Sequence, residues 1–337
     1  MNELRLIYRG VYPKLVCCQV IVRKMPNGDF CAFFQTGGPV EPHPDNRIYV
    51  SRSQDAGDTW SAPVLWHDFG DRAVTLTEVY LDNGEAHAFF YTHNGRQFDW
   101  KNFTCVSRDS GTTWEDFRPM PCLPGFAVIR GLVRDPDDGS WMLPYQRFEE
   151  GADFEALDAA GKTIADSALT FPKNGALLSR DHGLTWERSA ETAVPVDDFF
   201  WNENGVAALG GGRFVMLMRT NEGCLYRADS MDGGRTWSKA VPTDIPNPSS
   251  KIRLFNLPDG RVALLHNPNP IRGFMHRNPL SLWISDDGLK TFCEKRDLAT
   301  FPGALSYPDG FLSEDGRVLH YGFDYNRHDA IYGRVSL

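Results

Sequence analysis

The sequence predicts an all-β fold assembled from repeated units, and three observations support this. An eight-residue motif, Ser-x-Asp-x-Gly-x-Thr-Trp, recurs along the 337-residue chain. Short Asn-Gly, Asp-Gly and Gly-Gly turns recur between apolar runs, and such turns are strong β-hairpin signals. Aromatic residues make up 12% of the chain, which also has 31 glycines and 22 prolines. This composition is typical of many short strands joined by tight turns.

The eight-residue motif occurs four times intact and once in degraded form. The intact copies begin at Ser53, Ser107, Ser179 and Ser230, and the degraded copy begins at Ser285. In the degraded copy a leucine replaces the glycine and a phenylalanine replaces the tryptophan. The spacing indicates a unit of roughly 50 residues, with one longer interval, which is the signature of a repeat architecture.

Each motif is predicted to be a structural turn and not a functional site. Its aspartate can accept hydrogen bonds from backbone N–H groups just ahead of it. Its glycine accepts a backbone conformation that a Cβ would penalise. The tryptophan then covers the turn with apolar area, so each motif should tie one hairpin of its repeat.

These motifs resemble the Asp-boxes of the sialidase (neuraminidase) superfamily, also called BNR repeats. The resemblance implies a six-bladed β-propeller of four-stranded blades, with residues 1–337 forming a single catalytic domain. It is specific for the fold and much less so for the reaction, because function resides in sites grafted on folds.

The hairpin turns agree with six blades. The first hairpin is predicted within residues 15–35, around Asn27-Gly28. Similar turns follow at residues 82–84, 137–139, 210–212, 258–260 and 314–316. The last blade lacks a motif, and its strands near residues 318–321 and 330–335 are predicted to join an N-terminal strand, which removes the free edges.

The longest interval between motifs, about residues 149–173, is predicted to be an inserted loop with a helical turn near residues 152–157. Insertions into repeats map to loops, often on the binding face. A solvated surface loop without a role is the alternative.

The composition and charge of the chain indicate which classes of partner and cofactor to expect. The net charge is −9 with no basic block, which argues against nucleic acid, although a few local arginines could still bind an acidic sugar. No stretch approaches the roughly 18 apolar residues of a membrane span. The seven cysteines include no Cys-x-x-Cys pair, so no zinc and no other cofactor is expected. Free thiols and the absence of a signal-like N-terminal run lead us to expect a cytoplasmic protein.

The C-terminal half resembles the catalytic set of sialidases, which use a tyrosine nucleophile. A neutral tyrosine avoids the like-charge repulsion that a carboxylate would meet at a sugar acid. The matching order here is Glu203, Arg219, Arg277 and Tyr307. The resemblance implies that Glu203 activates Tyr307 and that the two arginines bind an anionic group.

Structural alternatives exist for all four residues. Glu203 could be an exposed residue at a strand start, and Tyr307 could be a core aromatic with a satisfied hydroxyl. Arg219 ends an apolar strand and therefore needs either a partner or a ligand. Arg277 could simply pair with an acidic neighbour.

The N-terminal half departs from the sialidase pattern. The place of the first of three family arginines falls near Cys17, Cys18 or Gln19, none of which can clamp a carboxylate, and Arg23 is the nearest arginine. Two further arginines could be substrate-binding or structural. They are Arg130 and Arg327.

The proton donor of the family is an aspartate on the loop before the first motif. Here that loop spans residues 37–47, and Glu41 is nearest to the matching position. Asp45 and His43 are rivals as proton donor, and His43 is also a candidate substrate-binding residue.

These residues leave three functions open. An exo-acting glycoside hydrolase on a terminal, acidic sugar accounts for the order of the four residues. Because the first arginine is absent, another glycosidase or a lyase acting on uronic acids is an alternative, with a histidine or tyrosine as base. No spacing singles out one of the nine histidines. A non-catalytic carbohydrate-binding propeller is the third reading.

Overall fold

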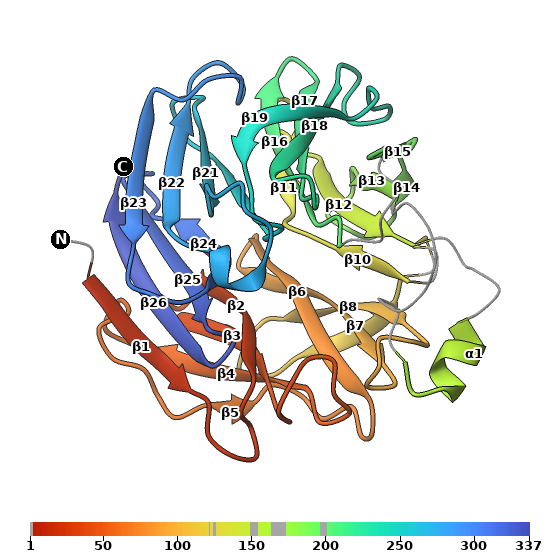
Figure 1. Cartoon of the computed structure of the whole chain (residues 1–337), viewed down its shortest axis with the longest axis vertical. Coiled ribbons are helices and arrows are strands. Elements are labelled where there is room, and N and C mark those ends of the chain that lie inside the picture. The colour runs from red at the N-terminus through yellow and green to blue at the C-terminus, as the bar shows by residue number, and fades with distance from the viewer. Residues whose placement is uncertain (1–2, 121, 124–125, 149–153, 163–172, 196–200) are drawn as a thin grey trace. The chain divides into compact units, whose positions relative to one another are not determined.

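The computed structural model describes residues 3–120, 122–123, 126–148, 154–162, 173–195 and 201–337. The chain divides into two compact units (Figure 1). Unit 1 comprises Met1–Gly125, Ala152–Asp166 and Ala304–Leu337, and unit 2 comprises Phe126–Gly151 and Ser167–Gly303. The two units are described separately below.

The strands of the described residues form six sheets, three in each unit. All of their strand pairs are antiparallel, as expected for sheets built from consecutive hairpins. The sheets are the blades of a six-bladed β-propeller, so the predicted fold class is confirmed.

Unit 1 contains three four-stranded blades. The first has β2 (Cys17–Lys24), β3 (Phe30–Thr36), β4 (Arg47–Ser53) and β5 (Val64–Leu65). The second has β6 (Ala73–Asp82), β7 (Glu85–His93), β8 (Lys101–Ser107) and β9 (Glu115–Pro119). The third has β24 (Leu305–Leu312), β25 (Val318–Tyr325), β26 (Asp329–Ser336) and β1 (Glu3–Arg9). Since β1 pairs with β26, the predicted joining of an N-terminal strand to the last blade is correct.

Unit 2 contains the other three blades. One has β10 (Ala127–Ile129), β11 (Val133–Arg134), β12 (Trp141–Arg147), β13 (Lys173–Ser179), β14 (Glu187–Arg188) and β15 (Thr192–Ala193). The next has β16 (Asn204–Gly210), β17 (Arg213–Met218), β18 (Cys224–Ser230) and β19 (Val241–Pro246). The last has β20 (Arg253–Asn256), β21 (Val262–His266), β22 (Leu280–Ser285) and β23 (Glu294–Ala299), with the 3₁₀ helix η2 (Phe274–His276) before β22.

The Asp-box motifs connect β4 to β5, β8 to β9, β13 to β14, β18 to β19 and β22 to β23. Their hydrogen bonds follow the predicted pattern. In the first box, Asp55 accepts a 2.8 Å bond from the Thr59 N–H and a 2.6 Å bond from the Thr59 hydroxyl. The Ser53 hydroxyl accepts a 2.8 Å bond from the N–H of Gly57, whose φ is 94°. A Cβ at Gly57 would lie 2.3 Å from the ring of Tyr332. Glycine is therefore required by both conformation and space.

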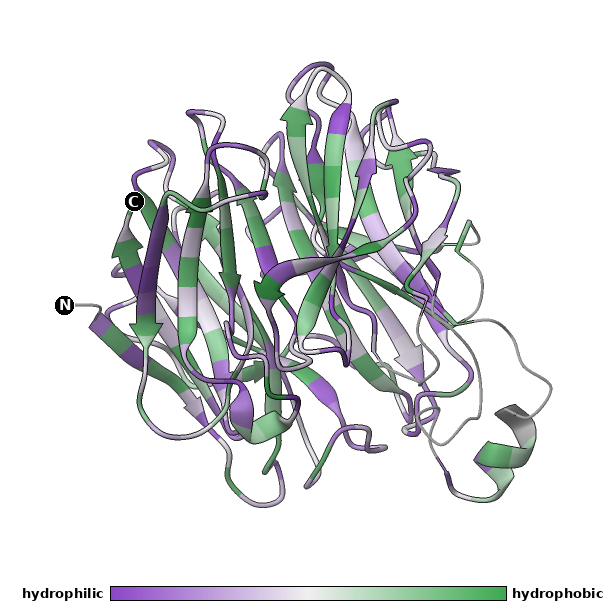
Figure 2. Cartoon of the chain, turned by 45° about the horizontal axis from the view of Figure 1, so that its top comes forward, coloured by the Kyte–Doolittle hydropathy of each residue, from purple (hydrophilic) through white to green (hydrophobic). Residues whose placement is uncertain are grey.

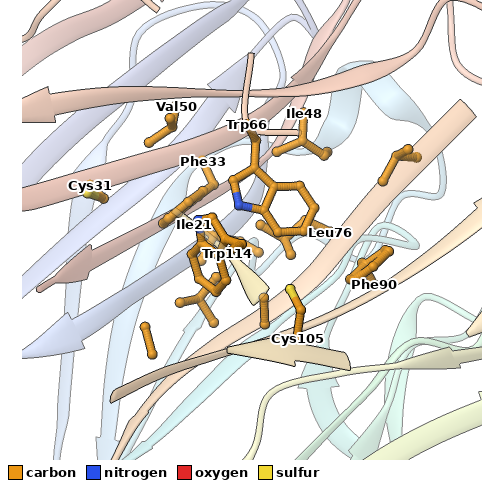
Figure 3. Packing of buried hydrophobic residues seen from close by; sticks show 14 of the residues in the cluster. Ile21, Cys31, Phe33, Ile48, Val50, Trp66, Leu76, Phe90, Cys105 and Trp114 are labelled. Carbon is orange, nitrogen blue, oxygen red and sulfur yellow. The ribbon is translucent and has the colours of Figure 1, made fainter. Parts of the chain in front are cut away.

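Apolar side chains from neighbouring strands form the cores between blades. In unit 1, Phe33, Trp66, Phe90 and the box tryptophan Trp114 pack together with Ile21 (Figure 3). The Trp66 and Trp114 ring centroids are 5.4 Å apart in an edge-to-face arrangement, which is a favourable geometry for aromatic pairs. Figure 2 shows that the strands carry most of the apolar residues while many turns are hydrophilic.

Arg23, the arginine nearest to the absent family position, belongs to a buried ionic network of unit 1. Its guanidinium pairs with Glu78 on β6 and lies 2.5 Å from Asp309 on β24. It also donates to the carbonyls of Val79 at 2.6 Å and Gly310 at 2.9 Å. Its donors are thus committed to tying β2, β6 and β24 together.

The segment predicted as an inserted loop contains α1 (Phe154–Ala159). Residues 149–153 and 163–172 of that segment lie outside the described residues. Within the described part of the chain, no helix has the length and apolar character needed to cross a membrane. The same part contains no group of three or more histidine, cysteine, aspartate or glutamate residues arranged to hold a metal ion.

Candidate functional site

Glu203 and Arg219 are brought together by one hairpin of unit 2. Glu203 immediately precedes β16 and Arg219 immediately follows β17, so the two lie opposite each other at the open end of this hairpin. The Arg219 N–H donates a 2.9 Å hydrogen bond to the Glu203 carbonyl. Their side chains form an ion pair in which the guanidinium donates to the carboxylate. Strand pairing therefore explains the spacing between them in the sequence.

Two more arginines of unit 2 lie around the Glu203 carboxylate. Arg130 follows β10, and its guanidinium lies 3.5 Å from Glu203 Oε1. Arg277 follows η2, and its charge also acts on Glu203. All four side chains belong to buried residues, with 2% of Glu203 and 6–7% of each arginine exposed. One carboxylate among three guanidinium groups gives these four side chains a net charge of about +2.

The cations keep Glu203 ionised despite its burial. Burial by itself raises the pKa of the carboxyl, but the charges of Arg219 and Arg130, with the hydrogen bond from Arg219, outweigh it. The pKa of Glu203 is consequently lowered from its ordinary value. At neutral pH this side chain is a carboxylate, which can accept a proton but has none to donate.

Ser249 is a residue of this site that the sequence reasoning missed. Its hydroxyl oxygen accepts a 3.0 Å bond from Arg219 Nε and donates a 2.8 Å bond to Asn221 Oδ1. Its carbonyl accepts a 2.9 Å bond from Arg277 Nη2. One residue thus holds two arginines. Asn247-Pro248-Ser249-Ser250 signals only a turn in the sequence, so nothing there pointed to this role.

The candidates of unit 1 lie around Arg327, which follows β25. Its guanidinium pairs with Glu41, a residue of the loop between β3 and β4 whose side chain is 8% exposed. The Cys18 thiol lies 3.5 Å from Glu41 Oε2, within the limit for a sulfur hydrogen bond. Arg327 also hydrogen-bonds Cys18. A guanidinium therefore reaches the neighbourhood of Cys18, where the sequence lacks the family's first arginine.

Tyr307 is on β24, also in unit 1. The Arg327 guanidinium carbon lies 5.9 Å from the centre of its ring. The residue is 7% exposed and has a φ of 52°. A left-handed conformation costs a bulky residue energy and persists only where the surrounding structure holds the backbone in place. Tyr307 and Glu203 belong to different units, so the predicted activation of one by the other stays a prediction.

Asp45 and His43, the rival proton donors, are more exposed than Glu41. The Asp45 side chain is 72% exposed and that of His43 is 31% exposed. The Asp45 N–H donates a 3.1 Å bond to Nδ1 of His43, which lies 3.6 Å from an Asp45 carboxylate oxygen. These two residues contact each other, whereas Glu41 contacts Arg327 and Cys18.

Comparison with a family model decides the family. The model of the BNR repeat-like domain matches residues 28–320, which is more than half of the chain. The chain belongs to the BNR repeat-like domain family.

This BNR repeat-like protein is also similar to a sialidase relative over part of its length. It is 28% identical to an anhydrosialidase from Macrobdella decora over 176 residues, which cover 46% of this chain and 22% of that protein. The match thus spans about a fifth of that relative's length.

Solved structures show the same fold. The BNR repeat-like protein resembles the Hadza microbial sialidase Hz136 with a TM-score of 0.75, at 18% identity, over 96% of this chain and 66% of that one. It resembles a protein of unknown function from Dyadobacter fermentans with a TM-score of 0.72, at 21% identity, over 99% of this chain and 98% of that one. Likeness at such low identity is evidence for the fold and not for a shared reaction.

Proposed function

We propose that this protein is an exo-acting glycoside hydrolase that removes a terminal acidic sugar through a tyrosine nucleophile. The observation that carries the proposal is the buried cluster of Arg130, Arg219 and Arg277 around Glu203. Buried guanidinium groups are costly unless they are paired, and they bind carboxylates by paired hydrogen bonds. Three guanidinium groups gathered at one buried site therefore suit a ligand that carries a carboxylate.

Tyr307 is the proposed nucleophile and Glu203 the proposed base. An ionised Glu203 is in the protonation state that a base requires. A tyrosine hydroxyl is neutral until it reacts, so it approaches a sugar acid without like-charge repulsion. The left-handed backbone at Tyr307 is consistent with a side chain held in a fixed direction.

Glu41 is the proposed proton donor, with Arg327 as a further binding group. In the ligand-free chain Glu41 is paired with Arg327. A substrate carboxylate that takes over the Arg327 guanidinium would leave a largely buried Glu41 without its cation. Loss of a cation and burial both favour the protonated carboxyl. Binding of an acidic sugar would therefore prepare the acid that protonates the leaving oxygen.

Hydrolysis of aryl glycosides tests this function. An aryl sialoside, aryl uronides and neutral aryl glycosides are compared on the wild type and on Tyr307→Phe. We expect release from an acidic glycoside and a loss of about a thousandfold in kcat for Tyr307→Phe. Tyr12→Phe is the matched control, because Tyr12 is 86% exposed; it should keep full activity.

The outcomes separate the alternatives. Undiminished turnover by a folded Tyr307→Phe variant would refute the tyrosine mechanism. Absorbance from an unsaturated uronide product would show that the protein is a lyase and not a hydrolase. The absence of turnover on every substrate would favour a non-catalytic carbohydrate-binding propeller.

A further inference from the structure

A cavity of about 710 Å³ lies in unit 2 beside the degraded Asp-box. Its residues come from β18, β19, β22 and β23, from the degraded box and, through Met231, from the intact box after β18. The aromatic side chains Trp283 and Phe292 form part of its wall, with their ring centroids 4.9 Å apart. The volume falls within the range of about 300–1,000 Å³ that is usual for small-ligand sites.

The degraded box differs from the intact boxes where this cavity opens. In the intact box that begins at Ser230 the glycine lies against a side chain of another blade: a Cβ at Gly234 would lie 2.1 Å from Met142 Cε. In the degraded box Leu289 occupies that position, is 2% exposed, and keeps the left-handed conformation with a φ of 66°. Phe292 stands where the intact boxes have the larger tryptophan. Leu289 thus adds an apolar side chain to the core, and Phe292 occupies less volume beside the cavity than a tryptophan would.

The cavity is distinct from the cluster around Glu203. Glu203 and Arg219 are at the start of β16 and the end of β17. The next strand, β18, runs away from that end, and its far half supplies Arg227 and Asp229 to the cavity. The Asp-box after β18 therefore lies at the end of that blade opposite to Glu203 and Arg219.

Positively and negatively charged side chains line the cavity beside the aromatic rings. Arg227 and Asp229 pair at 2.7 Å, which orients both. Lys295 Nζ lies 3.9 Å from the centre of the Trp283 ring. Lys290 and Asp244 also line the cavity. Such an exposed cation–aromatic contact is worth only about 0.5–1 kcal/mol, so a ligand can displace the lysine from the indole.

We propose that this cavity is a second saccharide-binding site, separate from the catalytic residues, for a sugar unit that carries a carboxylate. An aromatic surface bordered by a few hydrogen-bonding groups suits a sugar ring, which has an apolar face and polar edges. The charges of Arg227 and Asp229 cancel. Lys290 and Lys295 then exceed Asp244 by one positive charge, which matches a single carboxylate. This proposal does not depend on the hydrolase activity, although such a site would hold a polymeric substrate of the enzyme.

Restoring the box residue tests the proposal. Phe292→Trp introduces the indole of the intact boxes, which we expect to fill the cavity without unfolding the blade. Calorimetric titrations of 3′-sialyllactose, trigalacturonate and lactose are performed with Tyr307→Phe protein, so that a substrate is not consumed. Phe292→Trp is then added to that background. We expect an acidic sugar to bind at two sites in the first protein and at one in the second, with lactose weaker at the cavity.

Charge variants give an independent measurement. Lys290→Glu should weaken binding of the acidic sugar at the cavity by about tenfold or more. Lys162→Glu makes the same change at an exposed lysine outside the cavity and should have no effect. Binding that is unchanged in both Phe292→Trp and Lys290→Glu would overturn the proposal, whether the starting protein binds the acidic sugar at one site or at two. Whether or not the cavity binds a sugar, the hydrolysis assay on the wild type would give the same result. The proposed second site and the proposed hydrolase function can therefore be refuted independently.

Discussion

At the scale of single residues, two residues of the proposed chemistry have a left-handed backbone conformation. Tyr307 has a φ of 52° and Ser249 a φ of 64°. Neither is a glycine, so each holds a conformation that costs roughly 1–2 kcal/mol per residue. Ser249 joins Arg219 through its hydroxyl and Arg277 through its carbonyl. A strained backbone there is consistent with a residue that positions two guanidinium groups.

Ser249→Ala should raise KM for the acidic glycoside by about fivefold while changing kcat less, because the lost hydrogen bond is worth about 1 kcal/mol. Ser249→Gly should raise KM equally but relieve the backbone strain. It should therefore be at least as stable as the alanine variant in urea unfolding.

Ser250→Ala is the matched control for this pair. The Ser250 hydroxyl is buried and has no hydrogen-bond partner among the described residues. Its removal should leave KM unchanged. Equal KM values in the wild type, Ser249→Ala and Ser249→Gly would show that Ser249 does not position the arginines.

At the scale of elements, blades within unit 1 are tied by charge as well as by apolar packing. Arg23 on β2 pairs with Glu78 on β6 and with Asp309 on β24. All three residues are at most 5% exposed. Removing the arginine would leave two buried carboxylates without their cation, which is far more costly than the loss of a surface pair.

Arg23→Met should lower the free energy of unfolding by about 3–5 kcal/mol, measured by urea denaturation. The neighbouring Lys24 offers a matched comparison, because it pairs with Glu314 at 2.6 Å but both side chains are well exposed. Lys24→Met should cost less than about 1 kcal/mol. Similar losses in both variants would contradict the structural role assigned to the Arg23 network.

At the scale of the whole molecule, both units contain groups that bind fewer protons when folded. Burial lowers the pKa of His93 and of His266 to about 3, from an ordinary value of 6.5. Hydrogen bonds from the box threonines lower the pKa of Asp55 and Asp181 to about 2, from 3.8. Since the unfolded chain takes up these protons first, all four groups make stability fall as the pH falls.

The melting temperature should therefore be nearly constant above pH 6.5 and should decline in two stages. The histidines account for the decline below about pH 6.5, and the box aspartates for a steeper decline between about pH 4 and 2. Differential scanning fluorimetry across pH 2–8 measures this profile. His266→Gln should make the decline in melting temperature below pH 6.5 shallower, because it removes one of the histidines that contribute, and should not alter the decline between about pH 4 and 2. A melting temperature that rises on acidification from pH 7 to 4 would refute this account.

The sequence and the structure agree best where interactions are local. The hairpin turns and Asp-boxes could be located because each is closed by bonds within a few residues, such as Asp55 to Thr59. Glu203 and Arg219 were both identified as candidate residues from their order in the sequence, and one hairpin brings the two together. Arg23 and Ser249 could not be interpreted this way. Their partners are distant in sequence, such as Asp309 for Arg23, and periodicity carries no information about such contacts.

The sequence by itself determined the family, the six blades and the order of the candidate residues, because repeated motifs and turn chemistry act over short stretches of chain. Only the tertiary structure decided that three arginines surround Glu203, that Arg327 reaches Cys18 and Glu41, and that a cavity opens at the degraded box. These features depend on side chains that meet after the strands have paired. Burial and neighbouring charge, which set their chemistry, exist only in the folded chain.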